Sequence, residues 1–162
     1  MSISEDIFSK FNVSRETHND LLIFKNLLLK KNKILNLISK NDEKIIDIRH
    51  ICDSAQVIDM FNENIKKCSD LGSGSGFPAI ILSILVKHKN FKTNFILYEK
   101  SFRKSEFLSE IINKLKLDAT VVNKNIVELK NLESETIIAR AFKPIEEIFE
   151  IMNKNFFNYN NL

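Results

Sequence analysis

All three glycines of this 162-residue chain lie within five positions, at Gly72, Gly74 and Gly76. They fall in the segment 70–78, which reads DLGSGSGFP. Glycine adopts left-handed backbone conformations and permits close approach of the backbone at no steric cost, unlike any other residue. A chain that places all its glycine in one short segment therefore indicates a loop that turns tightly against a ligand, as cofactor-binding loops do.

Apolar segments of strand and helix length alternate on both sides of this loop. We expect strands at 65–71, 91–99, 119–122 and 136–139, and helices that begin at Pro78, Ser101 and Pro144. Repeated alternation of strand and helix predicts an α/β fold with a parallel sheet covered on both faces. The first strand carries Lys66, Lys67 and Ser69, which are unusual in a strand buried on both sides.

The first 61 residues follow a helical pattern instead. Ser14 can cap one helix, and Asn41 or Asp42 can start a second. The apolar residues expected on the inner faces of these helices are Leu21, Leu22, Phe24, Leu28 and Leu29 in the first, and Ile45, Ile48, Ile51 and Val57 in the second. No repeat or flexible linker separates the two halves. We expect one domain over 1–162, with a helical extension at 1–61 and an α/β core at 62–162.

Composition narrows the class of protein. The net charge is +3, and the lysines form short clusters that could contact nucleic acid or could reflect an A+T-rich coding sequence. Cys52 and Cys68 are too few for a metal site or a disulfide framework, so we expect no metal. The start lacks the pattern of a signal peptide, and no apolar run approaches the ~20 residues of a membrane span. We expect a cytoplasmic protein that does not bind membranes.

The spacing of the loop favours one cofactor over others. The third glycine falls one residue too early for a dinucleotide-binding fingerprint, and the Lys-Ser/Thr ending of a phosphate-binding loop is absent. Asp70 precedes the glycines, and Glu99 ends the next strand at the position where an acid holds a ribose diol. This arrangement is the one used for S-adenosylmethionine: Asp70 orients the loop or the amino group, and Glu99 holds the ribose. The alternative is a tight turn with a surface glutamate.

The segment 70–78 resembles the RsmG (GidB) family of bacterial methyltransferases that act on small-subunit ribosomal RNA. Four other segments are similar to the family in order and spacing: NKILNL at 32–37, RHICDS at 49–54, Glu99 followed by Arg103 and Lys104, and ARAF at 139–142. The resemblance extends over residues 20 to about 155. It implies a Rossmann-like, S-adenosylmethionine-dependent methyltransferase sheet with an N-terminal helical extension.

The resemblance also implies an activity, the transfer of a methyl group to N7 of a guanine in 16S ribosomal RNA within the small ribosomal subunit. Guanine N7 carries a free lone pair, so the reaction requires alignment rather than a general base. The residues expected to bind the cofactor are Asp70, Gly72, Gly74, Gly76, Phe77, Glu99, Ile126, Val127 and Arg140. Arg140 is the expected catalytic residue at the reaction face.

The remaining site residues are assigned to RNA or to the helical extension. His50, Arg103 and Lys104 are the expected RNA contacts, and His50 with Asp53 is expected to orient the extension against the catalytic face. Family members continue with further strands after the last helix, whereas residues 156–162 can supply one short fifth strand at most. Two alternatives follow: a shortened, catalytically inactive member that retains RNA or cofactor binding, and a small-molecule methyltransferase.

Overall fold

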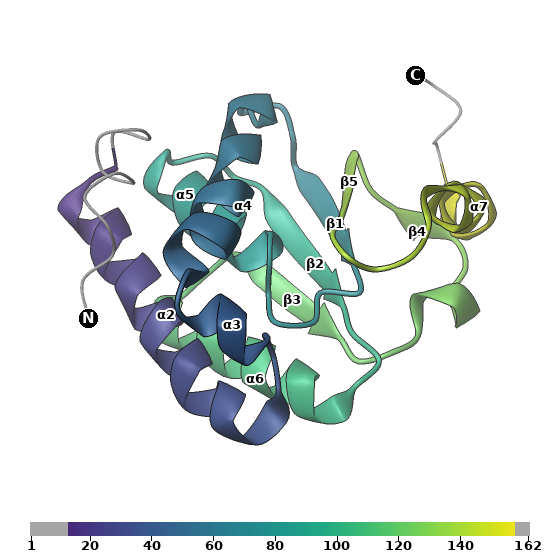
Figure 1. Ribbon diagram of the computed structural model, residues 1–162. Coiled ribbons are helices and arrows are strands. Elements are labelled where there is room, and N and C mark those ends of the chain that lie inside the picture. The colour runs from purple at the N-terminus through teal and green to yellow at the C-terminus, as the bar shows by residue number, and fades with distance from the viewer. Residues whose placement is uncertain (1–12, 158–162) are drawn as a thin grey trace.

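The structure is a computed structural model, and it describes residues 13–157. Four parallel strands form its central sheet in the order β3-β2-β1-β5 (Figure 1). The strands are β1 (Lys67–Leu71), β2 (Asn94–Tyr98), β3 (Ala119–Val122) and β5 (Thr136–Ala139). Each lies within a predicted segment, so the predicted α/β fold with a parallel sheet is confirmed. The carboxyl ends of all four strands meet at one edge of the sheet.

The polar residues expected in the first strand lie either at its amino end or buried within it. Lys66 precedes the strand, and Lys67 lies at its first position, where its ammonium group is 3.4 Å from the carboxylate of Glu133. The next four residues are buried, including Ser69 and Asp70. The lysines are therefore confined to the amino end of the strand, where they reach solvent.

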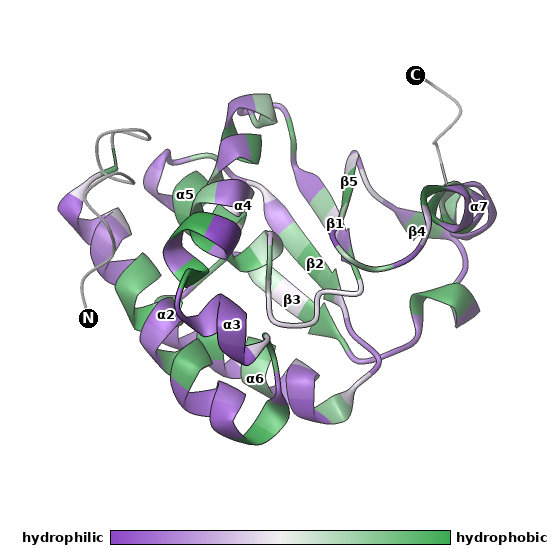
Figure 2. Ribbon diagram, in the orientation of Figure 1, coloured by the Kyte–Doolittle hydropathy of each residue, from purple (hydrophilic) through white to green (hydrophobic). Residues whose placement is uncertain are grey.

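Three helices cover one face of the sheet: α2 (Arg15–Leu35), α5 (Ala79–His88) and α6 (Phe102–Leu115). Helix α5 is buried from Ala79 to Val86 because it lies between the sheet and α2. Figure 2 shows α2 as alternating hydrophobic and hydrophilic bands, as expected of a helix with one buried face. Leu21, Phe24 and Leu28 of α2 share one hydrophobic cluster with α5, α6 and the strands. The helical extension and the sheet therefore have a common core.

The opposite face of the central sheet is less extensively covered by helices. Helix α7 (Ile145–Asn155) lies beyond β5 and contributes Ile151 to a second cluster, together with Leu71, Tyr98 and Ile126 (Figure 1). The expected short strand after α7 forms as β6 (Phe156–Phe157), but it pairs with β4 (Leu132–Glu133) rather than with the main sheet. Within residues 13–157, β5 is therefore an edge of the central sheet.

The helical extension differs in part from the prediction. Ser14 caps α2, since its hydroxyl accepts a hydrogen bond from the Thr17 N–H at 3.2 Å. The second helix begins earlier than predicted, because Ser39 and not Asn41 or Asp42 caps α3 (Lys40–Glu43).

The chain then continues as a π-helix, η1 (Asp47–Cys52), before α4 (Asp53–Ala55) and the 3₁₀ turn η2 (Gln56–Met60). Wider π turns change which side chains face inward. Ile51 is fully buried, but Ile45 and Ile48 are exposed, so their predicted inner positions are wrong. Among the described helices, none has the length and apolar character needed to cross a membrane.

Candidate active site

The glycine loop is joined to the end of β2. The backbone N–H groups of Gly72 and Ser73 both donate to the carbonyl of Tyr98, each at 3.0 Å. All three glycines have positive φ, at +73° for Gly72, +54° for Gly74 and +96° for Gly76. Non-glycine residues adopt this region only with strain. The predicted tight turn is therefore present.

Each glycine has its own steric environment. A Cβ atom on Gly72 would lie 2.2 Å from Cδ2 of Phe142, and one on Gly76 would lie 2.7 Å from Cγ1 of Ile80. A Cβ on Gly74 would meet only the carbonyl oxygen of Gly72, at 3.7 Å. Gly72 and Gly76 thus allow side chains to pack closely against the loop, while Gly74 leaves open space beside it.

That space belongs to a cleft of about 870 Å³. It opens at the carboxyl ends of β1, β2 and β5, where open α/β sheets bind their ligands. The predicted site residues that line it are His50, Gly72, Gly74, Phe77, Glu99, Lys104, Ile126, Val127 and Arg140. Asp70, Gly76 and Arg103 are not among its lining residues. The structure therefore gathers most of the predicted site around one cleft.

Glu99 forms part of the cleft wall at the end of β2. One carboxylate oxygen accepts the N–H of Gly74 at 2.9 Å, and the other accepts the N–H of Ser101 at 2.7 Å. The side chain of Asn123 donates to the Glu99 carbonyl at 2.8 Å. A carboxylate has about four acceptor positions, so each oxygen keeps capacity for a ligand hydroxyl. Asn123 was not predicted; its only sequence signal is that it directly follows the third strand.

Asp70 lies behind the loop and is almost completely buried. Its Oδ2 has no hydrogen-bond partner within the described residues. Burial raises the pKa of Asp70 from 3.8 to about 7; the nearby Ser73 hydroxyl opposes this rise, and the charge of Glu99 adds to it. Bringing a cation into the cleft would favour the ionised carboxylate.

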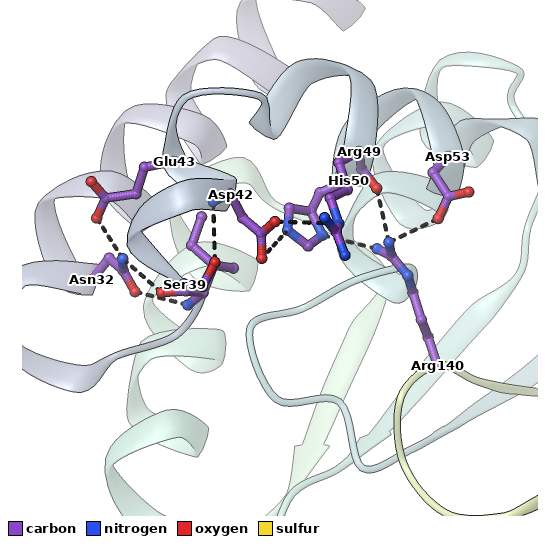
Figure 3. Close-up of polar contacts among 9 residues, drawn as sticks. Asn32, Ser39, Asp42, Glu43, Arg49, His50, Asp53 and Arg140 are labelled. Atoms are coloured by element: carbon purple, nitrogen blue, oxygen red, sulfur yellow. Dashed lines mark hydrogen bonds and ion pairs between the residues drawn. The ribbon is translucent and has the colours of Figure 1, made fainter.

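Arg140 follows β5 and extends toward the helical extension (Figure 3). Its Nη2 lies 2.8 Å from Oδ2 of Asp53 and donates to the Arg49 carbonyl at 2.8 Å. Its Nη1 lies 3.1 Å from Nδ1 of His50. Arg140 therefore connects the carboxyl edge of the sheet to η1 and α4 while it lines the cleft.

The His50 ring has neighbours on three sides. It stacks on Phe77 with ring centroids 4.8 Å apart, and Phe77 packs edge to face on Phe24 at 5.4 Å. Its Nε2 faces Oδ2 of Asp42 at 3.7 Å. Burial, and then the charge of Arg140, lowers the pKa of His50 below its ordinary value, although Asp42 opposes this. The neutral ring of His50 is therefore favoured, and its contact with RNA stays a prediction.

Asn32 is the first residue of the segment NKILNL at 32–37, and its side chain has a structural role. Its buried amide nitrogen donates to the Ile38 carbonyl at 3.0 Å and to the Glu43 carboxylate at 2.6 Å, while its oxygen accepts the N–H of Ile38 at 2.8 Å (Figure 3). These bonds fix the turn after α2, and Leu37 and Ile38 of that turn line the cleft. This role of Asn32, like that of Asp42, was not predicted.

Lysines surround the cleft. Lys100, Lys104 and Lys124 line it without an ion pair to any described residue, and Lys143 pairs with Glu147. Arg103, predicted as an RNA contact, is exposed on α6 outside the cleft. In the part of the chain that the structure describes, no group of His, Cys, Asp or Glu side chains is placed to hold a metal ion.

Comparison with known proteins agrees with this geometry. The family model GidB, described as rRNA small subunit methyltransferase G, matches residues 17–161. The chain belongs to the GidB family. The resemblance seen in the five motifs is therefore confirmed.

Curated GidB relatives carry the name ribosomal RNA small subunit methyltransferase G. One from Pelagibacter ubique is 42% identical over 166 residues, which is 98% of this chain and 78% of that protein. One from Cereibacter sphaeroides is 35% identical, over 90% of this chain and 71% of the relative. The family is thus matched along most of the chain.

Solved structures confirm the fold alone. A mutant of MtNAS in complex with S-adenosylmethionine superimposes with a TM-score of 0.52 and 14% identity, covering 92% of this chain and 58% of that one. Coclaurine N-methyltransferase, bound to N-methylheliamine and SAH, gives 0.53 and 13% identity, covering 93% and 53%. The predicted methyltransferase-like α/β fold is confirmed.

Proposed function

We propose that this GidB family protein transfers a methyl group from S-adenosylmethionine to N7 of a guanine in 16S ribosomal RNA. The observation that carries the proposal is the cofactor loop itself, in which the Gly74 N–H binds the Glu99 carboxylate at the wall of an open cleft. The curated relatives carry the name of a small-subunit ribosomal RNA methyltransferase. Since the substrate is ribosomal RNA, we place the reaction in the cytoplasm.

The residues of the cleft suit S-adenosylmethionine. Glu99 offers acceptor positions for ribose hydroxyls, and the open side of Gly74 leaves room for the methionine part. Ile126 and Val127 supply apolar atoms for the adenine. Asp70 lies behind the loop with an unpaired oxygen, so its charge can favour a cationic ligand through the loop. When bound, the cofactor supplies a methyl group on a positively charged sulfur, which a lone pair displaces.

The rest of the cleft suits an RNA nucleotide. Lys100, Lys104 and Lys124 present unpaired cations at its wall, and such cations bind phosphates with release of counterions. Guanine N7 has its lone pair available at pH 7, so the protein must align the base rather than deprotonate it. Arg140 lines the same cleft and carries N–H donors suited to a phosphate or a guanine edge.

The two alternatives are less well supported. An inactive member that retains only RNA binding would need no cofactor loop, yet the loop and Glu99 line one cleft together with Arg140. A small-molecule methyltransferase would leave the cleft lysines without a role. We therefore retain the ribosomal RNA methyltransferase as the single proposal.

Cofactor binding and methyl transfer test this proposal together. We expect calorimetric binding of S-adenosylmethionine and transfer of its labelled methyl group to small-subunit RNA from a strain that lacks the enzyme. Gly74→Asp places a charged side chain in the open space before the loop and should abolish both. Asn131→Asp is the matched control, because it adds the same charge at a positive φ of +59° outside the cleft. No binding heat and no labelled RNA with the unaltered protein would refute the proposal.

A further inference from the structure

Three segments that are far apart in the sequence meet at the ring of His50. The glycine loop contributes Phe77, which stacks on the ring, and the end of β5 contributes Arg140, which contacts Nδ1. The turn and helix after α2 contribute Asp42, which faces Nε2 (Figure 3). His50 therefore lies where the cofactor loop, the sheet edge and the helical extension come together.

Hydrogen-bond chemistry determines which nitrogen of the His50 ring carries the proton. A guanidinium carries only donors, so a 3.1 Å contact between Arg140 Nη1 and His50 Nδ1 requires Nδ1 to be the acceptor. The ring proton is then on Nε2, which points toward the Asp42 carboxylate. The backbone N–H of Asp42 donates to the Ser39 hydroxyl at 3.1 Å, and the Asp42 carboxylate lies 3.2 Å from the Arg49 side chain. The surroundings thus favour one neutral tautomer of His50.

The same contacts leave some N–H donors of the Arg140 guanidinium available for a ligand. Nη2 is used by Asp53 and by the Arg49 carbonyl, and one N–H of Nη1 is used by His50. With both terminal nitrogens held, the guanidinium has a fixed orientation. The other Nη1 hydrogen and the Nε hydrogen have no partner among residues 13–157, and Arg140 lines the cleft. Two donors are therefore left for a ligand.

We propose that His50 is a positioning residue: its neutral ring, fixed by the stack on Phe77, accepts a hydrogen bond from Arg140 and so holds the two free donors of Arg140 toward the RNA substrate. The expected effect of His50 on kcat rests on the proposed function, whereas the tautomer of His50 and the fixed orientation of the Arg140 guanidinium do not. Protonation of His50 removes the acceptor and places a second cation beside Arg140. The charged groups that face His50 are Arg140, Arg49 and Asp42, and Asp53 acts through Arg140.

Two amide substitutions separate this role from a merely structural one. In His50→Asn, the amide oxygen can occupy the place of Nδ1, whereas in His50→Gln the polar atoms reach the place of Nε2. Both variants lose the stack on Phe77, so they are matched in that respect. A hydrogen bond to a charged group corresponds to about 10-fold to 100-fold in rate. We expect kcat for His50→Asn to exceed that of His50→Gln by at least about 10-fold, with similar affinity for S-adenosylmethionine.

The pH profile and nitrogen NMR give readouts that a structural role would not change. The unaltered protein should lose kcat as His50 becomes protonated below its lowered pKa, and His50→Asn should lack that step. In the cofactor-free protein, ¹⁵N spectra at pH 7 should show a neutral His50 with its proton on Nε2. Rotation of the Arg140 guanidinium should be more hindered in the unaltered protein and in His50→Asn than in His50→Gln, where only the two contacts of Nη2 remain.

The NMR measurements can overturn the inference without depending on the reaction. A charged His50 at pH 7, a proton on Nδ1, or equal guanidinium rotation in the two variants would refute it. Equal kcat values in the two variants would refute it as well. If the unaltered protein does not methylate ribosomal RNA, the proposed function fails, while the NMR results still decide whether His50 positions Arg140.

Discussion

Alanine at Gly76 and at Gly74 should separate the packing role of the loop from its ligand role. A Cβ on Gly76 would lie 2.7 Å from Cγ1 of Ile80 and 3.1 Å from Cδ2 of Leu108, both of which are fully buried. A Cβ on Gly74 would point into open space, with only the Gly72 carbonyl at 3.7 Å. The two substitutions are chemically identical, so any difference comes from their surroundings.

The expected magnitudes follow from these distances. A left-handed conformation costs a non-glycine residue roughly 1–2 kcal/mol, and both positions incur that cost. Overpacking a buried site adds roughly 1–3 kcal/mol, and only Gly76 incurs it. We therefore expect Gly76→Ala to lose about 2–5 kcal/mol and Gly74→Ala about 1–2 kcal/mol in the free energy of unfolding.

Urea unfolding and calorimetry measure the two effects separately. With a slope of about 2 kcal/mol per molar urea, the unfolding midpoint of Gly76→Ala should fall by roughly 1–2.5 M and that of Gly74→Ala by roughly 0.5–1 M. The affinity for S-adenosylmethionine should fall in Gly74→Ala out of proportion to its stability. The reasoning is refuted if Gly74→Ala is the less stable variant, or if it binds the cofactor as well as the unaltered protein does.

Three further predictions concern the charged groups. Glu99→Gln should weaken cofactor binding at least about 10-fold by calorimetry, because one of two backbone N–H groups loses its acceptor; unchanged affinity would contradict this. For Asp70, the pKa is about 7 in the folded protein against 3.8 for the ordinary group of the unfolded chain. The favourable contribution of its protonated carboxyl to the free energy of unfolding is therefore complete below about pH 4 and is lost as pH rises through 7. Asp70→Asn should therefore match the unaltered protein in urea unfolding at pH 4 and be more stable at pH 8, whereas parallel curves would exclude the shift. Lys104→Ala should reduce the salt dependence of RNA binding by about 0.7–0.9 in the slope of log K, while Lys89→Ala, which follows α5 at the opposite sheet edge, should leave it as it is.

Features set by local pattern could be predicted from the sequence. The strand positions follow from short apolar segments, the cap of α2 from Ser14, and the turn of the loop from its glycines. Glu99 was found because its spacing from the loop depends only on one strand-helix-strand unit. Each of these depends on residues that are near one another along the chain.

Features set by distant contacts could not be predicted in the same way. The resemblance indicated Arg140 and His50 separately, but their contact joins residues 90 positions apart. The pairing of β4 with β6 is equally nonlocal. The π-helix η1 shifted the inner face of the extension, so the helical period used for Ile48 did not apply. Asn123 and Asp42 act through the backbone and through other side chains, and such roles have no sequence motif.

Mass mapping of modified guanines in 16S ribosomal RNA tests the central claim most directly. RNA from a strain that lacks the enzyme should be compared before and after incubation of its small subunits with this protein and S-adenosylmethionine. The account predicts one new 7-methylguanine, which is absent when Gly74→Asp replaces the unaltered protein. Identical guanine maps with and without the unaltered protein, under conditions where it binds the cofactor, would contradict it.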